Sequence, residues 1–153
     1  HIAEIADIVA LCNANIYSIH YAKAKNLLTD EYEKVRKIYA DFPRSMHARA
    51  AVLTVWRIAY LDSSTYRKVP DKVLGDARTW ANSYPTEIEF PEGYFGLLLA
   101  RLEYAQAHDQ RNEQRRLFRE MKSVAERTDY SEYNEDSDML ASIKKLQQVY
   151  GYQ

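Results

Sequence analysis

Apolar residues recur along this chain at steps of three and four positions, the spacing that gathers side chains on one face of an α-helix. The first such stretch runs from Ile2 to Leu28, and the second runs from about Glu31 to Asp41. Asp30 followed by Glu33 has the spacing of a capping box at the start of the second stretch, and Pro43 stops it. The pattern therefore predicts two successive helices before Pro43.

The same spacing predicts five more helices, separated by polar or proline-containing connections. The first two are expected to run from a Ser45 cap to near Asp62 and from Pro70 to before Pro85. The third should run from the end of the Thr86–Pro91 connection to about Ala107, the fourth from an Asp109 cap onward, and the fifth from about Glu135 to Tyr150. The predicted buried stripe of the first of these five is Ala48, Ala51, Val52, Val55, Ile58 and Ala59. Because short connections make neighbouring helices antiparallel, we expect an all-α fold.

An aromatic-proline stop occurs twice at a fixed distance, in residues 38–43 and again in residues 80–85. Three trios of residues fall in equivalent places, with spacings of 42 and 44 residues: Val35, Ala77 and Met121; Ile38, Trp80 and Val124; Phe42, Tyr84 and Thr128. Self-similarity at such a period is typical of stacked helical pairs, in which each repeat buries the apolar face of the next. We therefore expect an α-α superhelix of about seven antiparallel helices, with three pairs and a C-terminal capping helix.

In these residues the chain resembles the tetratricopeptide-repeat superfamily, in a variant whose period is longer than the usual 34 residues or so. The resemblance rests on Val73, Ala77, Trp80 and the Tyr84-Pro85 stop, and on the Tyr21-Ala22 and Tyr104-Ala105 pairs late in the first helices of their repeats. It covers the chain from about Ile5 to Thr128. It implies an α-helical superhelix that binds a peptide or a partner protein in its concave groove, without catalysis.

A second repeated column combines cations with tyrosines. Arg57, Arg101 and Lys145 are spaced 44 residues apart, and a tyrosine follows each arginine by three positions. At about 100° per residue, Arg57 lies roughly 140° from the apolar stripe of its helix, so it is expected to face a different surface. The Arg/Tyr column, which we define as Arg57, Tyr60, Tyr94, Arg101, Tyr104 and Lys145, is predicted to hold an acidic or extended peptide through guanidinium contacts. The alternative is that its cations pair with carboxylates such as Glu103 or Asp62, or cover apolar surface with their stems.

Another basic stripe follows the sixth predicted helix. Arg111, Arg115, Arg119 and Lys122 share one helix face, with Glu113, Glu120 and Glu126 interspersed along the same segment. This pattern is typical of a solvated outer face, and the alternative is a patch for an anionic partner. Among the 13 tyrosines of the chain, those near the C-terminus are the better candidates for an interface, namely Tyr130, Tyr133, Tyr150 and Tyr152.

Composition limits the classes of function. The 153 residues suit a single domain over 1–153, and the start at His1 rather than at Met suggests a fragment of a larger protein. The 21 basic and 22 acidic side chains give a net charge of −1, so no global field draws the chain to nucleic acid or to a membrane surface. There is no apolar run long enough for a membrane-spanning helix, and no membrane insertion is expected.

The remaining chemistry is sparse. Cys12 is the single cysteine, and the chain contains no Asn-x-Ser/Thr acceptor, which favours a reducing compartment such as the cytoplasm, although periplasmic and secreted chains without either feature also exist. Its position on the apolar stripe of the first predicted helix suits a buried, inert thiol. The histidines are isolated and the glycines form no phosphate loop, so we expect no metal, no cofactor and no catalytic site.

Two functions follow from these features. The first is a non-catalytic scaffold or adaptor that binds a protein or peptide partner, with an acidic partner favoured by the Arg/Tyr column. The second is a self-associating structural module of a larger assembly, in which the C-terminal tyrosines are buried in a homo-oligomer.

Overall fold

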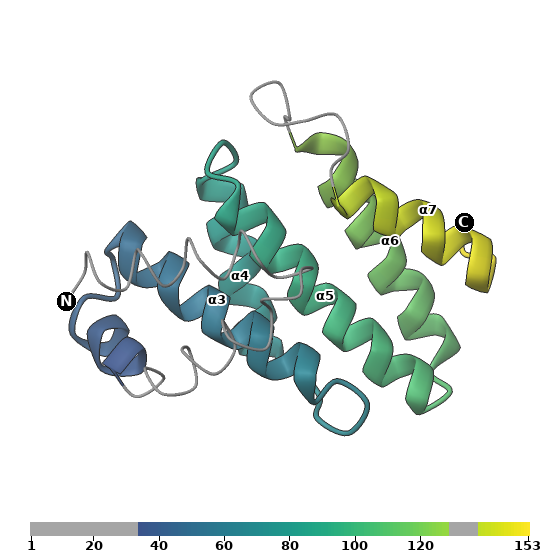
Figure 1. The fold of residues 1–153 in the computed structure, drawn as a ribbon, viewed down its shortest axis with the longest axis horizontal. Coiled ribbons are helices and arrows are strands. Elements are labelled where there is room, and N and C mark those ends of the chain that lie inside the picture. Colours follow the sequence, from purple (N-terminus) through teal and green to yellow (C-terminus); the bar gives the residue numbers. More distant parts are fainter. Residues whose placement is uncertain (1–33, 129–137) are drawn as a thin grey trace, which may run out of the picture. The chain divides into compact units, whose positions relative to one another are not determined.

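The computed structural model describes residues 34–128 and 138–153, and every regular element in these two ranges is helical (Figure 1). Helix occupies residues 34–41, α3 (Met46–Asp62), α4 (Asp71–Ser83), α5 (Glu89–Ala107), α6 (Arg111–Arg127) and α7 (Asp138–Tyr150). The all-α prediction is thereby confirmed for the described part of the chain. Outside it lie the predicted helix from Ile2 to Leu28 with Cys12, the predicted capping box, and two of the candidate interface tyrosines, Tyr130 and Tyr133.

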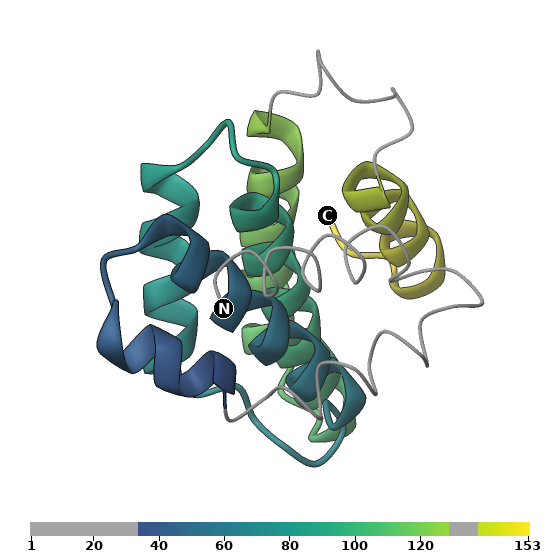
Figure 2. The same ribbon diagram turned by 60° about the vertical axis from the view of Figure 1, so that its left-hand side comes forward.

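The chain divides into two compact units, His1–Ala59 and Tyr60–Gln153, and the single domain over 1–153 stays a prediction. Helix α3 continues from the first unit into the second, and α4 to α7 all belong to the second unit. Within the second unit α5 contacts both α4 and α6, while α7 contacts α6 (Figures 1 and 2).

In the first unit the helix over residues 34–41 buries Val35 and exposes Phe42. Both residues belong to the repeat trios, which predict apolar faces buried between repeats, but Phe42 has 55% of its surface exposed. The reason is that the helix ends at Asp41: the Phe42 N–H still donates to the carbonyl oxygen of Ile38 over 2.8 Å, and the turn at Pro43 follows directly. The prediction is correct for Val35 and wrong for Phe42.

Helix α3 begins where its sequence predicts. The backbone N–H of Ala48 donates to the Ser45 Oγ over 3.3 Å, which is the contact of an N-cap serine with the third helical residue. Five residues of the predicted stripe are buried, namely Ala48, Ala51, Val52, Val55 and Ile58. The cap and these stripe residues are confirmed.

Proline marks both ends of α4. Pro70 directly precedes the first helical residue in an extended conformation, and its carbonyl oxygen accepts from the Leu74 N–H over 3.1 Å. The helix ends at Ser83, two residues before Pro85, and buries Ala77, Trp80 and Ala81. Helix α5 begins at Glu89, earlier than expected, because Pro91 fits in its first turn, where a missing N–H breaks no hydrogen bond.

The connection from α5 to α6 differs from its prediction at Asp109. The residue that caps α6 is Gln110, and it makes no side-chain capping bond. Asp109 instead has a φ of 53°, a left-handed conformation that aspartate tolerates better than most residues. The sharp reversal lets the Gln110 N–H donate to the carbonyl oxygen of Ala105 over 2.9 Å, so α6 returns alongside α5. The predicted Asp109 cap is therefore wrong.

The predicted repeat columns agree with burial in the apolar positions. The first trio, Val35, Ala77 and Met121, is buried throughout, and so are Trp80 and Val124 of the second. The third trio is uneven, since Phe42 is exposed while Thr128 is buried and bonds the Val124 carbonyl oxygen through its hydroxyl over 2.6 Å. The spacing thus predicts burial correctly for the whole first trio and for two residues of the second, whose third member, Ile38, is half-buried.

A glycine turns the chain back after α7. Gly151 has a φ of 67°, the left-handed conformation that commonly ends helices, and its N–H donates to the Gln147 carbonyl oxygen over 2.9 Å. The turn directs the following residue, Tyr152, onto α6, where its ring centroid lies 5.1 Å from that of Phe118. Met139 and Ile143 supply the buried apolar residues of α7 itself.

Candidate functional site

The Arg/Tyr column is mostly buried. Four of its six members have less than a tenth of their surface exposed, namely Arg57, Tyr60, Tyr94 and Arg101, whereas Tyr104 is half-buried and Lys145 is exposed. The expected exposed face for Arg57 is wrong, because α3 is buried beyond its apolar stripe: Leu53 and Thr54 are buried as well. Partner binding by these residues stays a prediction, but most of their side chains are not accessible to a partner in this structure.

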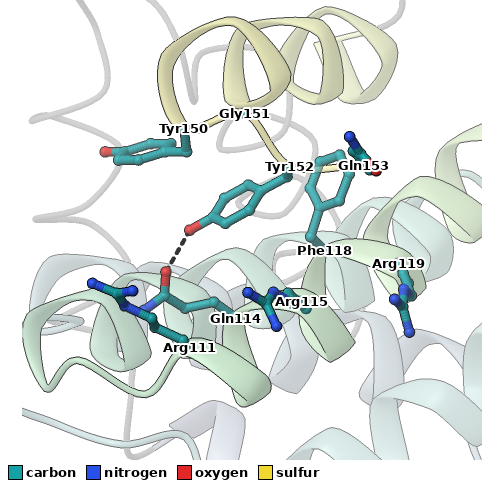
Figure 3. Close-up of a pocket in the computed structure, with 9 residues that line it drawn as sticks. All are labelled: Arg111, Gln114, Arg115, Phe118, Arg119, Tyr150, Gly151, Tyr152 and Gln153. Atoms are coloured by element: carbon teal, nitrogen blue, oxygen red, sulfur yellow. Dashed lines mark hydrogen bonds between the residues drawn. The ribbon is translucent and has the colours of Figure 1, made fainter.

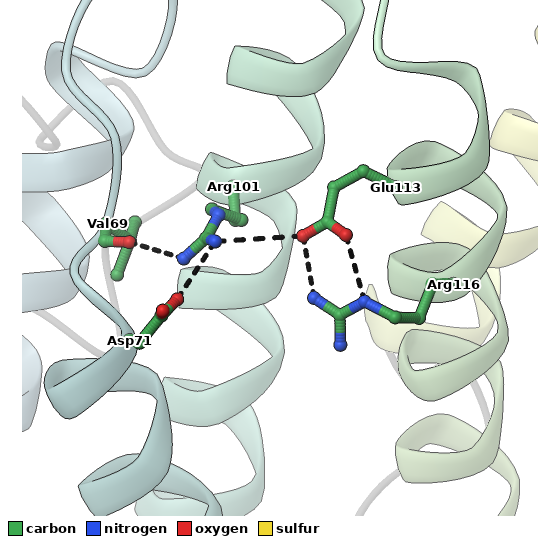
Figure 4. A network of polar contacts seen from close by, with 5 residues as sticks. All are labelled: Val69, Asp71, Arg101, Glu113 and Arg116. Carbon is green, nitrogen blue, oxygen red and sulfur yellow. Dashed lines mark hydrogen bonds and ion pairs between the residues drawn. The ribbon is translucent and has the colours of Figure 1, made fainter.

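The Arg101 guanidinium holds three segments of the second unit together (Figure 4). Its Nη1 donates to the carbonyl oxygen of Val69 over 2.6 Å, and its Nη2 lies 2.9 Å from Oδ1 of Asp71 and 3.7 Å from Oε1 of Glu113. Arg116 grips the two oxygens of Glu113 from the other side, at 2.9 and 2.6 Å. Arg101 thus joins the start of α4 to α5 and α6.

The alternative interpretation of the column is therefore correct in kind for Arg101, which pairs with carboxylates. The partners of Arg101 are neither Glu103 nor Asp62, the two carboxylates named from the sequence, and Glu103 instead accepts a hydrogen bond from the Ser64 hydroxyl. These partners could not be named from spacing, because Asp71 and Glu113 lie on α4 and α6.

The tyrosines of the column also make internal contacts. The Tyr94 hydroxyl donates to Glu120 over 2.9 Å, and burial, followed by the charge and hydrogen bond of this carboxylate, raises the pKa of the phenol. The Arg67 guanidinium lies 4.4 Å from the Tyr60 ring centroid, and Tyr104 stacks on the His108 ring at 3.9 Å. These contacts fix the rings within the second unit.

A different set of residues forms an accessible site, a cavity of about 540 Å³ between one face of α6 and the end of α7 (Figure 3). We call it the cationic pocket. Its walls are Arg111, Gln114, Arg115, Phe118 and Arg119 from α6 and Tyr150, Gly151, Tyr152 and Gln153 from the C-terminal side.

Local structure explains how these residues meet. The three arginines are four positions apart, so they lie in a row along one helix face. Tyr152 is anchored by two hydrogen bonds: its hydroxyl donates to Oε1 of Gln114 over 2.8 Å and accepts from Nε2 of Gln106 over 2.9 Å. The Tyr150 ring stacks beside Tyr152 with centroids 5.5 Å apart and stays 54% exposed.

The pocket carries an uncompensated positive charge. Its three arginines contribute +3, and no acidic side chain lines it. Within the described residues the guanidinium groups of Arg111, Arg115 and Arg119 have no hydrogen bond or ion pair, in contrast to the neighbouring Arg116, which Glu113 holds. Guanidinium groups bind carboxylates and phosphates through paired hydrogen bonds, so the row is available for an anionic ligand.

The side chains of the pocket are of few chemical kinds. They provide cations, amides and aromatic rings, without a nucleophile next to a base. Across residues 34–128 and 138–153, no three His, Cys, Asp or Glu side chains come together as metal ligands would. None of the helices in these ranges combines the length and the apolar character that crossing a bilayer requires.

Sequence reasoning identified the two halves of this site separately. The basic stripe and the tyrosines at positions 150 and 152 were both candidates, but their meeting depends on the Gly151 turn and on the packing of α7 against α6. Gln114 and Phe118 were not singled out, and only their helical spacing from the arginines could have indicated them.

Comparison with known proteins does not assign the chain to a family: no family model matches it, and neither a curated protein nor a solved structure does.

The Arg101 network predicts a loss of stability in acid. The hydrogen bond and charge of Arg101 lower the pKa of Asp71 below its ordinary value of 3.8, and the hydrogen bond from Arg116 lowers that of Glu113 below 4.5. Because both pKa values are depressed by folding, their contribution is complete above these ordinary values and is lost as the pH falls through the lower folded ones. The urea midpoint should therefore fall below about pH 4.5, and the fall should be smaller in the double variant Asp71→Asn, Glu113→Gln. If the urea midpoint fell equally steeply with pH in the parent and in the double variant, Asp71 and Glu113 would not be the source of the acid sensitivity.

Proposed function

We propose that this protein is a non-catalytic protein- or peptide-binding module that captures an acidic segment of its partner in the cationic pocket. One observation carries the proposal: three arginines whose guanidinium groups have no partner among the described residues line one cavity together with two tyrosines. The neighbouring Arg101 and Arg116 are held by carboxylates, so the arginines of the pocket are distinguished by their environment and not by residue type.

The size and the walls of the pocket support binding. Its volume falls within the roughly 300–1,000 Å³ typical of ligand sites in proteins. Tyr152 is fixed by its two hydrogen bonds and by Phe118, so little side-chain freedom remains to be lost when a ligand arrives. A hydrogen bond to a charged group contributes about 1.5–3 kcal/mol, so a few carboxylate contacts could hold a short peptide.

We propose further that the protein forms a helical superhelix of the tetratricopeptide-like kind. A tetratricopeptide-like superhelix of about seven helices, three pairs and a capping helix, is supported by the repeated burial at Val35, Ala77 and Met121 and by the short connection from α5 to α6. Scaffolds of this kind bind partners through extended surfaces. The cationic pocket lies on α6, the second helix of the third proposed pair.

The proposal predicts selective binding of acidic peptides. A fluorescein-labelled glutamate-rich peptide should bind the full chain in an anisotropy titration, while a lysine-rich peptide of the same length should not. Arg115→Glu places a negative charge in the centre of the row and should weaken binding by tenfold or more, about 1.4 kcal/mol.

The matched control is Arg78→Glu, which makes the same charge change at an exposed position of α4 outside the pocket. It should reduce affinity only slightly. Equal weakening by the two variants would show that net charge governs binding, and a failure of the acidic peptide to bind would refute the proposal.

Self-association is the second candidate function. It is favoured by two adjacent exposed residues at the end of α7, Val149 and Tyr150, with 61% and 54% of their surface exposed. Light scattering distinguishes the candidates: a dimer that blocks peptide binding would favour self-association, and a monomer that binds the peptide would favour the module.

A further inference from the structure

The cationic pocket is the middle one of three hollows that follow α6 from its first to its last turn. A hollow of about 570 Å³ at the N-terminal end shares Arg111 with the pocket. Another of about 440 Å³ at the C-terminal end shares Arg119 and Gln153 with it. The shared wall residues make the three hollows neighbours along the helix, and we call this series of hollows the track.

Charge is distributed unevenly along this track. The middle hollow has only cations among its charged walls. The N-terminal hollow adds Asp109 and Glu113 to its cations, and the C-terminal hollow adds Glu126. A ligand that fits the whole track is therefore most acidic in its centre and carries fewer negative charges on either side.

The spacing of the arginines matches an extended chain. Residues four apart on a helix are separated by about 6 Å along its axis, whereas alternate residues of an extended peptide are about 6.7 Å apart and point the same way. Over the three arginines the mismatch grows to about 1.4 Å, which flexible arginine side chains can absorb. Successive alternate side chains of the ligand would thus meet Arg111, Arg115 and Arg119 in turn.

We propose that the partner binds as an extended segment of about seven residues along α6, with acidic side chains at alternate positions facing Arg111, Arg115 and Arg119. This inference rests on the proposed function and adds the ligand's conformation and register. The length follows from the arginine row: Arg111 to Arg119 span about 12 Å of helix, about five extended residues reach across them, and one flanking residue at each end makes seven.

The track disfavours two other ligands. A helical partner needs apolar anchors set into an apolar groove, but arginines occupy the corresponding positions here. Single-stranded nucleic acid could stack on Tyr150, but it has a negative charge at every nucleotide, and the carboxylates of Asp109, Glu113 and Glu126 reduce the positive charge that the outer hollows offer to those charges. A peptide can place its charges only where the arginines are.

Two synthetic peptides of identical composition test the register. Ser-Glu-Ser-Glu-Ser-Glu-Ser can direct three carboxylates at the arginine row, whereas Ser-Ser-Glu-Glu-Glu-Ser-Ser can direct at most two, because consecutive side chains of an extended chain point to opposite sides. The two peptides have the same length, the same net charge and the same loss of chain entropy when they bind in an extended conformation. The alternating peptide should bind the full chain about tenfold more tightly by anisotropy. Arg111→Gln should remove most of this difference, while Arg78→Gln should leave it intact.

Each outcome decides between the claims. A preference for the alternating peptide that Arg111→Gln abolishes supports the register. Equal affinity for the two peptides overturns the extended register but leaves the proposed function standing, and lack of binding by both refutes the proposed function as well. Displacement of the alternating peptide by oligouridylate at lower concentration than by unlabelled peptide would overturn the inference in favour of nucleic acid.

Discussion

Replacing Phe118 with alanine is expected to lower the free energy of unfolding of the second unit by about 3–5 kcal/mol. Only 1% of Phe118 is exposed, and it lies on α6 next to the fully buried Leu117. Its ring also contacts Tyr152. The substitution would leave a void between α6 and the C-terminal residues, because packed helices close such a space only in part.

Urea unfolding followed by circular dichroism measures this effect. Phe118→Leu keeps much of the volume and should cost less than half as much as Phe118→Ala, while Ser123→Ala, at an exposed position of the same helix, should stay within about 0.5 kcal/mol of the parent. A cost below about 1 kcal/mol for Phe118→Ala would show that α7 does not pack on α6 as described.

Replacing Arg101 with alanine is expected to cost about 2–4 kcal/mol. The side chain is 6% exposed and serves the Val69 carbonyl oxygen, Asp71 and Glu113 together. Its removal leaves the buried Val69 without this donor and deprives Glu113 of one of its two cations. The loss should appear as a lower urea midpoint, with helix α4 affected first because its start is held by this contact.

The control is an ion pair of similar length on the surface. Lys72 and Asp76 are 3.0 Å apart, but the Lys72 side chain is 84% exposed. Because solvent screens such pairs and their side chains lose entropy, Lys72→Ala should change stability by at most about 0.5 kcal/mol. If Arg101→Ala were as mild as Lys72→Ala, Arg101 would not hold the three segments together.

Sequence patterns predicted the elements of this fold well wherever local chemistry sets them. The Ser45 cap and the Pro85 stop act within a few residues, so their effects could be read directly. Asp109 shows the limit of such signals, because aspartate suits both a helix cap and a left-handed turn, and the choice between them depends on how α6 returns onto α5.

The candidate site was harder to predict for a different reason. Arg57 and Arg101 repeat at a regular spacing, but their burial depends on how much of each helix is covered, which periodicity does not report. Arg115 has the sequence features of an ordinary surface residue. It becomes a candidate only because Tyr152, 37 positions later, is turned onto the same helix face by Gly151 and lines the same cavity.

We propose different roles for two arginines on neighbouring helices, Arg101 on α5 and Arg115 on α6. Arg101 is buried and satisfied by internal carboxylates, so it serves stability. Arg115 is exposed and has no internal partner within the described residues, which is why we propose it for recognition. Substituting Arg101 should therefore change the free energy of unfolding far more than the affinity of the folded protein for the peptide. Substituting Arg115 should change the affinity far more than the free energy of unfolding.

Titration of the isotope-labelled full chain with Ser-Glu-Ser-Glu-Ser-Glu-Ser, followed by nuclear magnetic resonance, shows whether the cationic pocket binds the peptide. We expect the Nε–Hε signals of Arg111, Arg115 and Arg119 and the amide signals of residues 150–153 to shift together and to saturate at one peptide per chain. Shifts centred instead on Tyr60, Tyr104 or Lys145, with the α6 arginines unaffected, would contradict this expectation.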